Sequence, residues 1–462
     1  MFAIPGIIGL LFFIYIRPQE AITELQSIPF LYICFSLAVL GMAVDMRLRI
    51  NKLVSLPHWT WAVAFYFWCV LSVAINAPDE LLRTLLLFSI TIFIFFVIGQ
   101  SIQRFRVLEF VAFSIALLAL FLAYVGADQG FAETVCIQLP EGKGASSGSI
   151  IGHPDGRTCE TIFDCYENDP EPGADYWCQK PGLLGTHSVG GRVRYRGVLQ
   201  DPNELALAIG AGLAFAIALW VRVRNLRKLL FLAVMVATAA ICIYFTRSRS
   251  GQLVFLSTFG VFILWKFRWK AIVLGLPLAI PLLFIIASGG GRADASASTM
   301  ERYEAWRTGL ELFGTSPIWG VGQGQFTEYH HLTAHNTFIL VLGELGLGGT
   351  FIFLTMLWVS IKTPLKGYFR YRNNPKTRVA EVWCIGMLAA FAAIFSGALF
   401  LSFAYHYILW IYMGLSAALF SCIQHHDPTF RVKVRVIDLV MIFLTIIGLY
   451  VAFDFFLLAK HV

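Results

Sequence analysis

The sequence predicts an all-α polytopic membrane protein with about 12–13 transmembrane helices. Of the 462 residues, 58% are hydrophobic and only 14% are charged, whereas a typical soluble domain has roughly 25% charged residues. The mean hydropathy is +0.72. Apolar runs recur along the whole chain with the length of about 17–25 residues that crosses the roughly 30 Å hydrocarbon core. A soluble fold of this size would lack the charged surface that it needs.

The expected membrane helices follow the apolar runs in order. These runs lie near residues 2–16, 28–44, 59–76, 84–100, 107–125, 203–221, 229–246, 251–265, 271–288, 336–360, 380–401, 404–422 and 437–458. The first run lacks the basic segment and small-residue cleavage site of a secretory signal peptide, so we interpret it as a membrane helix. The chain then divides into an N-terminal five-helix region (1–125), a Cys-rich loop (126–202), central helices (203–288), a second loop (289–335) and C-terminal helices (336–462).

Charge determines the predicted orientation. Alternate short loops carry clusters of Lys and Arg, such as Arg47, Arg49 and Lys52, and the positive-inside rule places these loops in the cytoplasm. The two long connections, 126–202 and 289–335, then lie on the exported side. This distribution accounts for the net charge of +7, and no aromatic-basic motif indicates nucleic-acid binding.

The first long loop is rich in cysteine. Four of the nine cysteines lie in it: Cys136, Cys159, Cys165 and Cys178. An even cluster in a Gly- and Pro-rich exported loop predicts two disulfides in an oxidising compartment, with three possible pairings. The alternative is a zinc site that includes His153 or His187, although the spacing fits no standard zinc finger. The loop is also a candidate docking module for an envelope partner.

Four polar groups lie on the exported side near predicted helix ends. The first is RVRYRGVLQDPNELA, in which Arg192, Arg194 and Arg196 precede Asp201 and Pro202. Asp followed by Pro is typical of a helix N-cap and first turn. The arginines carry planar forks that suit phosphate oxygens, and a solvated basic loop is the alternative.

The second group is TRSRSG, between two apolar runs. Arg247 and Arg249 end a membrane helix on the exported side, where the positive-inside rule disfavours them. Arginines that extend from a helix end to the membrane surface are the alternative. A tight turn here would direct Arg249 towards a cavity at the membrane surface.

The third group begins with an amphipathic helix. Arg302, Trp306, Arg307 and Leu310 repeat at helical spacing, which predicts a helix lying on the membrane. GVGQGQF follows this helix. We reject a nucleotide site there because no strand precedes the glycines. A glycine loop that lets backbone approach a substrate is the preferred interpretation.

The fourth group is HHLTAHNTFILVLGELGLGG. His335 and Asn336 stand at a helix N-terminus, where free N–H groups favour anions, although Asn336 also suits a simple N-cap. Glu344 lies roughly 12 Å deeper along the helix, and a carboxylate inside a membrane is a functional candidate; pairing with a neighbouring helix is the alternative. Close helix packing explains the glycines, which are Gly343, Gly346, Gly348 and Gly349.

These groups are expected on one membrane face, by topology. Three arginine clusters there would suit a diphosphate of about two negative charges. A histidine, whose ordinary pKa is near neutrality, can take a proton from an attacking hydroxyl. His330 and His331 have no Cys or carboxylate at ligand spacing, so we expect surface residues rather than a metal site.

HNTFILVLGELGLGG resembles the signature of the O-antigen ligase and polymerase superfamily of bacterial envelope glycosyltransferases. That signature is His, then Asn, Ser or Gln, nine residues, and Gly-x-x-Gly; His335, Asn336, Gly346 and Gly349 occupy its positions. RGVLQDPNELA, TRSRSG, RYEAWRTG and SPIWGVGQGQF resemble other blocks of the family, in the family's order. The resemblance covers residues 190–360, whereas the first five helices match only in topology.

The resemblance implies a GT-C-like fold in the bacterial inner membrane, with two long periplasmic loops. It implies transfer of a glycan from undecaprenyl diphosphate to a hydroxyl acceptor on the periplasmic side, with inversion and without a metal or other cofactor. His335 would act on the acceptor hydroxyl, as a base or as a positioning group. The implied diphosphate-binding residues are Arg196 and Arg249, with Arg302, Arg194, Arg247 and Arg307 as further candidates. Weaker site candidates are Glu344, Asp201, Asn203 and Asn336.

Several acceptors and functions stay open. The acceptor is lipid A core, another repeat unit or a protein, and the partners include membrane lipids and envelope polysaccharide assembly proteins. The competing function is a transporter or flippase of lipid-linked glycans. A transporter needs broken helices and charges along a midplane pathway, whereas the charges of this chain gather at helix ends.

Overall fold

The computed structural model describes residues 1–139, 152–167, 170–268, 270–271, 297–372 and 374–460. Eleven helices in this part of the chain are long and apolar enough to cross a membrane. The chain is therefore an all-α polytopic membrane protein. It forms two compact units. Unit 1 comprises Met1–Ile4, Val39–Glu109 and Gly291–Val462, and unit 2 comprises Pro5–Ala38 and Phe110–Gly290.

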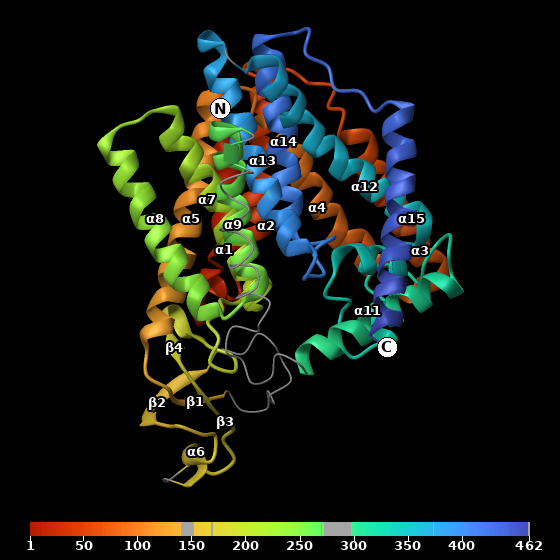
Figure 1. The fold of residues 1–462 in the computed structure, drawn as a ribbon. Coiled ribbons are helices and arrows are strands. Elements are labelled where there is room, and N and C mark those ends of the chain that lie inside the picture. The colour runs from red at the N-terminus through yellow and green to blue at the C-terminus, as the bar shows by residue number, and fades with distance from the viewer. Residues whose placement is uncertain (140–151, 168–169, 269, 272–296, 373, 461–462) are drawn as a thin grey trace. The chain divides into compact units, whose positions relative to one another are not determined.

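Unit 1 is built around one long helix. Its elements are α3 (Trp59–Asn76), α4 (Leu81–Ser101), α11 (Ala297–Thr315), α12 (Thr337–Tyr371), α13 (Arg378–Ala398), α14 (Tyr407–His426), α15 (Val436–Ala459) and the second half of α2 (Phe30–Arg47). α12 packs against α3, α11, α13, α14 and α15, and Figure 1 shows it passing through this set. α15 leaves most of its apolar surface exposed, as expected for a helix that faces lipid.

Small residues bring α4 and α14 together within unit 1. A Cβ at Gly99 would lie 3.1 Å from the Cβ of Ala417, and a Cβ at Gly414 would lie 3.1 Å from the carbonyl oxygen of Phe95. Small residues let membrane helices approach closely enough to gain van der Waals contact. The end of α4 is therefore fixed against α14.

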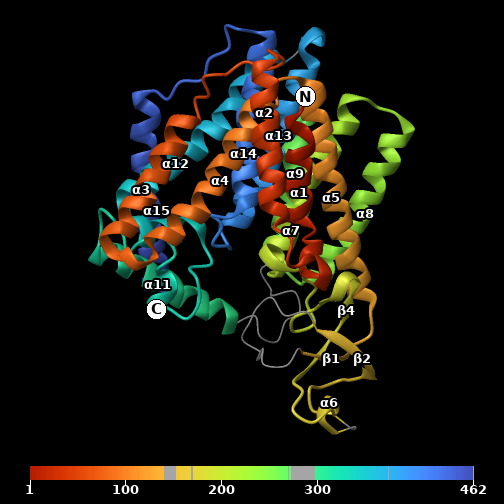
Figure 2. The same ribbon diagram turned by 180° about the vertical axis from the view of Figure 1, so that it is seen from behind.

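Unit 2 surrounds a buried helix. Its elements are most of α1 (Ala3–Tyr15), the first half of α2, most of α5 (Phe105–Phe131), α7 (Pro202–Arg222), α8 (Leu226–Thr246) and α9 (Arg249–Phe267). α7 is buried along nearly its whole length and contacts α8 and α9. A Cβ at Gly212 would lie 2.4 Å from the Cβ of Ala119, and one at Gly126 would lie 2.3 Å from Cys242 Sγ. Glycines therefore let α7 and α8 pack against α5, which runs beside α8 in Figure 2.

The Cys-rich loop of unit 2 contains two small antiparallel sheets. Strands β1 (Val135–Gln138), β2 (His153–Thr158) and β3 (Tyr176–Gln179) pair in the order β2-β1-β3, while β4 (Pro181–Gly182) pairs with β5 (Thr186–His187). A short helix, α6 (Asp164–Glu167), follows β2. The disulfides are Cys136–Cys165 and Cys159–Cys178, and these sulfurs pack with Tyr176 in a small core. The sequence predicted no strands here, because strands of two to six residues are too short to show a clear periodicity.

Twelve of the predicted helices coincide with observed helices. The remaining run, 271–288, lies outside the described residues from residue 272 onwards, so it stays a prediction. α1 has 13 residues, about 20 Å of helix, so it is shorter than the hydrocarbon core. The long charge-poor runs made the helices predictable because the bilayer requires that length.

Candidate functional site

The N-terminus of α12 carries Asn336 as its cap. Oδ1 of Asn336 accepts from the N–H groups of Phe338 (2.9 Å) and Ile339 (3.2 Å). Nδ2 of Asn336 donates to the carbonyl of Leu399 (3.0 Å). The amide therefore satisfies two free N–H groups of the helix and ties its start to the end of α13.

His335 lies immediately before this cap in a left-handed conformation. Its φ is +46°, a region that non-glycine residues seldom adopt. The N–H of His335 donates to Ser402 Oγ (3.0 Å). Thr337 Oγ1 donates to the carbonyl of Leu401 (2.7 Å) and accepts from the N–H of Phe403 (3.0 Å). The segment after α13 thus holds His335 in a strained conformation, which is a common feature of functional sites.

α12 is broken at Gly346, which has φ +62° and ψ −163°. Only glycine suits this position, because φ is positive and a Cβ would lie 2.4 Å from the carbonyl oxygen of Ile318. The glycine loop that follows α11 runs along the break. The N–H of Leu347, just after the break, donates to the carbonyl of Pro317 (2.8 Å).

The carbonyl groups at the break have hydrogen-bond donors. The carbonyl of Gly343 accepts from the N–H of Val321 (3.1 Å), and that of Glu344 accepts from the N–H of Gly322 (2.9 Å). The carbonyl of Leu345 accepts from the indole of Trp68 (3.0 Å), and that of Gly346 accepts from the hydroxyl of Thr350 (2.7 Å). An unsatisfied carbonyl in hydrocarbon costs several kcal/mol. The predicted glycine loop therefore brings its backbone to a broken membrane helix of the same unit.

Glu344 is buried at this break, with 2% of its surface exposed. Its Oε1 accepts from the N–H of Phe326 (3.2 Å), and the Tyr405 hydroxyl and the Cys69 thiol are its titratable neighbours. Burial, and secondly the charge of Glu344, raise the pKa of Tyr405. No Lys or Arg of the described residues forms an ion pair with Glu344. A Cβ at Gly320 would lie 2.2 Å from the Glu344 carbonyl, so the carboxylate and its backbone both hold the glycine loop.

α11 carries two of the predicted arginines and packs against α12 and α15. Arg307 forms ion pairs with Glu311 (3.1 Å) and Asp454 (3.7 Å), and Arg302 is half-buried. The Trp306 ring lies 5.2 Å from the ring of Phe453. The predicted helix is present, but it is packed on two membrane helices instead of lying only on lipid.

In unit 2, the start of α7 and the turn before α9 meet at Asn203. Asp201 caps α7 by accepting from the N–H of Asn203 (2.6 Å), and Glu204 accepts from the N–H of Asp201 (3.4 Å), which is a capping box. Oδ1 of Asn203 accepts from the hydroxyls of Ser248 and Ser250. Asp201 and Asn203 therefore anchor two helix starts.

Arg192 and Arg194 bind backbone carbonyls. Nε of Arg192 donates to Thr246 (3.0 Å) and Nε of Arg194 donates to His187 (3.1 Å). Burial lowers the pKa of Arg194, against the opposing charge of Asp201. Both arginines thus have partners that hold the loop.

Arg247 and Arg249 occupy different environments on either side of Ser248. Arg247 ends α8 with φ +47° and is exposed. Arg249 is the first residue of α9 and is half-buried. Oγ of Ser248 accepts from the N–H of Gly251 (2.9 Å) and so caps α9. Arg249 is therefore the more buried of the two arginines.

Arg196 differs from the other predicted arginines. It is 8% exposed, and its Nε, Nη1 and Nη2 atoms are buried without a hydrogen-bond partner among the described residues. Its Cζ lies 5.9 Å from the centre of the Tyr195 ring. Burial lowers the pKa of Arg196, because the charged form has lost water. A guanidinium with five N–H donors and no acceptor is suited to an anion.

Arg17, which follows α1, lies against the same segment of unit 2. It pairs with Glu20, and its Nε is buried without a partner among the described residues. A Cβ on Gly197, where φ is +58°, would lie 2.1 Å from Nη1 of Arg17. Tyr195 Oη donates to the carbonyl of Ile16 (2.7 Å). The arginine segment and the end of α1 are therefore in direct contact.

One continuous segment of the sequence contains both the turn before α9 and the break in α12, and this segment is known from other proteins. Residues 234–354 match the family model described as O-antigen ligase. The resemblance predicted from the sequence is thus confirmed over this region. The match supports a glycosyltransferase of the O-antigen ligase or polymerase type, with a lipid-linked glycan donor and a glycan acceptor in general terms. None of the curated proteins matches the chain.

The O-antigen ligase match includes the candidate residues of unit 1 but only part of those of unit 2. Arg249, Arg302, His335 and Glu344 lie inside it, and Arg196 precedes it. Sequence reasoning missed Arg17, which lies outside the match as well. A signal was present, because Arg17 follows an apolar run at the predicted exported end, where the positive-inside rule disfavours arginine.

Proposed function

We propose that the chain transfers a glycan from undecaprenyl diphosphate to a hydroxyl acceptor, as an O-antigen ligase or repeat-unit polymerase. The reaction takes place on the periplasmic side of the bacterial inner membrane. The observation that carries the proposal, beside the family match, is Arg196: a buried guanidinium whose nitrogens have no acceptor among the described residues.

The arginines bind the diphosphate in this proposal. Arg196 supplies a planar fork to two phosphate oxygens, and Arg249 supplies a second cation. The negative charge on the diphosphate grows by about one as the glycosidic bond breaks, so fixed cations stabilise the transition state more than the ground state. The burial of Arg196 strengthens this effect because water does not screen it.

His335 acts on the acceptor. Its imidazole takes the proton of the acceptor hydroxyl, and the hydroxyl oxygen attacks the anomeric carbon of the donor sugar. The bond between that carbon and the phosphate oxygen breaks, and undecaprenyl diphosphate leaves with the bonding electron pair. The left-handed backbone of His335 is held by Ser402, and Asn336 caps the helix behind it. His335 can therefore act from a fixed backbone.

A transporter of lipid-linked glycans shares one feature with this chain, a broken membrane helix. In transporters the carbonyls at such breaks are available to coordinate ions. In α12 they accept from Val321, Gly322 and Trp68. Occupied carbonyls favour a structural break, and glycosyl transfer remains the better supported function.

The test uses the purified full-length protein and one lipid-linked repeat unit, with and without a lipid acceptor. Product ladders without acceptor indicate a polymerase, and a single transfer that requires the acceptor indicates a ligase. We expect His335→Ala to lose at least about 100-fold in rate. His331→Ala, which changes an exposed histidine four residues away, is the matched control. Unchanged transfer by His335→Ala would overturn the assigned role, and no transfer by the unaltered protein with either acceptor would overturn the function.

A further inference from the structure

A cavity in unit 1 is lined by cations and lies where α4 and α14 end. Its volume is about 520 Å³, and its charged lining comes from Arg49, Lys52, Arg104, Arg431 and the titratable His425. No Asp or Glu is among the described residues that line it. By charge pattern this is the cytoplasmic end of the helices.

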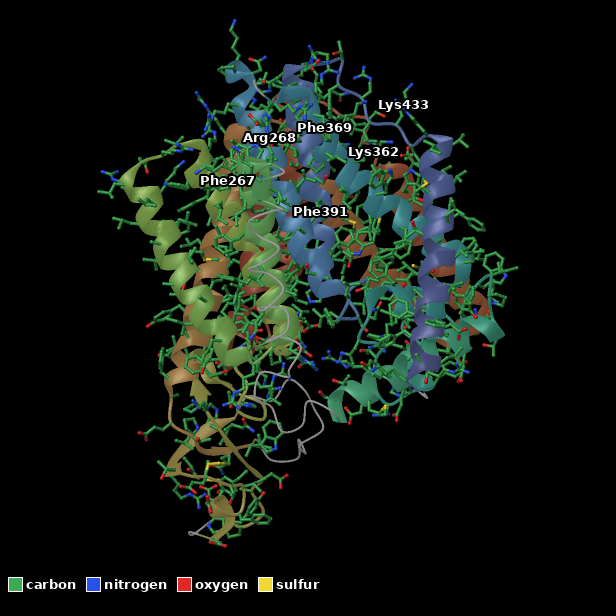
Figure 3. All side chains as sticks on the ribbon, in the orientation of Figure 1. Phe267, Arg268, Lys362, Phe369, Phe391 and Lys433 are labelled. Carbon is green, nitrogen blue, oxygen red and sulfur yellow. A yellow bond between two sulfur atoms is a disulfide. The ribbon has the colours of Figure 1, made fainter. Side chains whose placement is uncertain are left out.

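The positive-inside rule explains why cations lie near this end, but not why they lack counter-charges. Other cations of unit 1 have them: Lys362 lies 2.5 Å from Asp438, and Arg370 lies 2.7 Å from Asp427. Lys362, labelled in Figure 3, also donates to the carbonyl of Lys433 (3.0 Å). In the described part of the chain, Arg49, Lys52 and Arg104 form no ion pair. The cavity thus concentrates positive charge that unit 1 leaves unneutralised.

Two buried glutamines fix the loop that carries Lys52. Gln103 accepts from the N–H of Lys52 (3.2 Å) and donates to its carbonyl (2.5 Å). Gln100 likewise accepts from the N–H of Val54 (3.0 Å) and donates to its carbonyl (2.7 Å). Asn51 donates to the carbonyl of Ser101 (2.9 Å). The loop therefore needs no ligand to hold its shape, and preorganised donors bind more tightly than mobile ones.

The cavity also has an apolar wall. Ile50, Leu53 and Val54 line it beside the cations, and Leu53 is 72% exposed. A free phosphate ion has no apolar part that would contact this wall. A phospholipid needs both parts, because its phosphate is anionic and its glycerol and upper acyl carbons are apolar.

We propose that this cavity binds the phosphate headgroup of an anionic phospholipid. Its volume lies within the roughly 300–1,000 Å³ typical of small-molecule sites. Arginine forks match phosphate oxygens, and basic pockets between membrane helices are known to hold anionic headgroups. None of the residues that line the cavity is assigned to glycosyl transfer, so the two proposals stand or fall independently.

The experiment measures lipid retention by the full-length protein. The protein is delipidated in a neutral detergent and mixed with phosphatidylglycerol or phosphatidylcholine at equal mole fraction. Bound lipid is counted by native mass spectrometry, and melting is followed by tryptophan fluorescence. We expect preferential retention of phosphatidylglycerol, and at least a tenfold weaker retention in the double variant Lys52→Gln, Arg104→Gln.

The matched control removes two charges outside the cavity. Arg224→Gln with Arg227→Gln changes two exposed cations where α7 connects to α8, a connection with the same predicted orientation, and we expect retention to remain as in the unaltered protein. Equal retention of both lipids, or equal loss in both double variants, would overturn the proposal. Inorganic pyrophosphate is the third arm. If it raises the melting temperature as much as phosphatidylglycerol does, the ligand is a free phosphate compound and not a lipid.

Discussion

Two buried ionisable side chains, Glu344 in unit 1 and Arg196 in unit 2, differ in their hydrogen bonds. Oε1 of Glu344 accepts a hydrogen bond from the N–H of Phe326, whereas its Oε2 is buried without a partner among the described residues. Arg196 has no hydrogen-bond partner among the described residues. A buried charge without a partner costs several kcal/mol. We therefore expect Glu344 to contribute to the fold, and Arg196 to gain its missing partner from a ligand.

Arg196→Ala should produce the largest effect. Removal of a guanidinium that stabilises the leaving diphosphate is expected to lower the transfer rate by about 100–1,000-fold. The same change should leave the stability unchanged or raise it, because an unpartnered buried charge is removed. Transfer is measured on a lipid-linked repeat unit, and stability by thermal melting in detergent. Arg247→Ala, at an exposed arginine, is the control and should have the smaller effect.

The comparison would fail if Arg196→Ala melted earlier than the unaltered protein by several degrees. That outcome would mean that the guanidinium stabilises the fold like Glu344. Arg196→Lys sharpens the same point. It keeps the charge but loses the planar fork, so its rate should fall between those of Arg196 and the alanine variant.

Gly346→Ala tests the break in α12 beside which Glu344 is buried. The new Cβ would lie 2.4 Å from the carbonyl oxygen of Ile318, at a φ of +62°. We expect a loss of about 2–3 kcal/mol in unfolding free energy, measured by denaturation in mixed micelles. Gly448→Ala is the control, because a Cβ there meets nothing within 4 Å. Equal stability of the two variants would mean that α12 is continuous.

Glu344→Ala and Glu344→Gln separate the carboxylate's charge from its hydrogen bond. The amide oxygen of Gln can still accept from Phe326, whereas Ala leaves that buried N–H without a partner, at a cost of about 1–2 kcal/mol. The alanine variant should therefore melt earlier, and the glutamine variant should retain both stability and transfer. Loss of transfer in the glutamine variant at full stability would show that Glu344 has a catalytic role.

The sequence was informative wherever a property is local. Apolar length identified the helices, whereas residue type, predicted topology and the family resemblance made Arg196 and His335 candidates whose roles stay predictions. The break was not predictable, because glycines around residue 346 suit close packing equally well. The indole of Trp68 donates to the carbonyl of Leu345 at the break, and the two residues are 277 positions apart in the sequence. Such contacts depend on tertiary packing, which no local pattern contains.

Arg17→Ala has the smallest expected effect and extends the comparison to a residue with one partner. Arg17 pairs with Glu20, yet its Nε is buried without a hydrogen bond among the described residues, so its charge is partly satisfied, unlike that of Arg196. If it assists Arg196 in binding the diphosphate, transfer should fall by about tenfold, as for the loss of one charge-assisted hydrogen bond.

The control for Arg17 is Glu20→Gln, which frees the guanidinium without removing it. If Glu20→Gln transfers glycan at an unchanged or higher rate and Arg17→Ala is slower, then the positive charge of Arg17 itself contributes to transfer. Equal transfer rates in the two variants would mean that Arg17, like Glu344, serves the fold. The space that Gly197 leaves for the Arg17 guanidinium would then be enough to explain their contact. Arg196 would then be the only arginine of this segment whose burial still calls for an anion among the described residues.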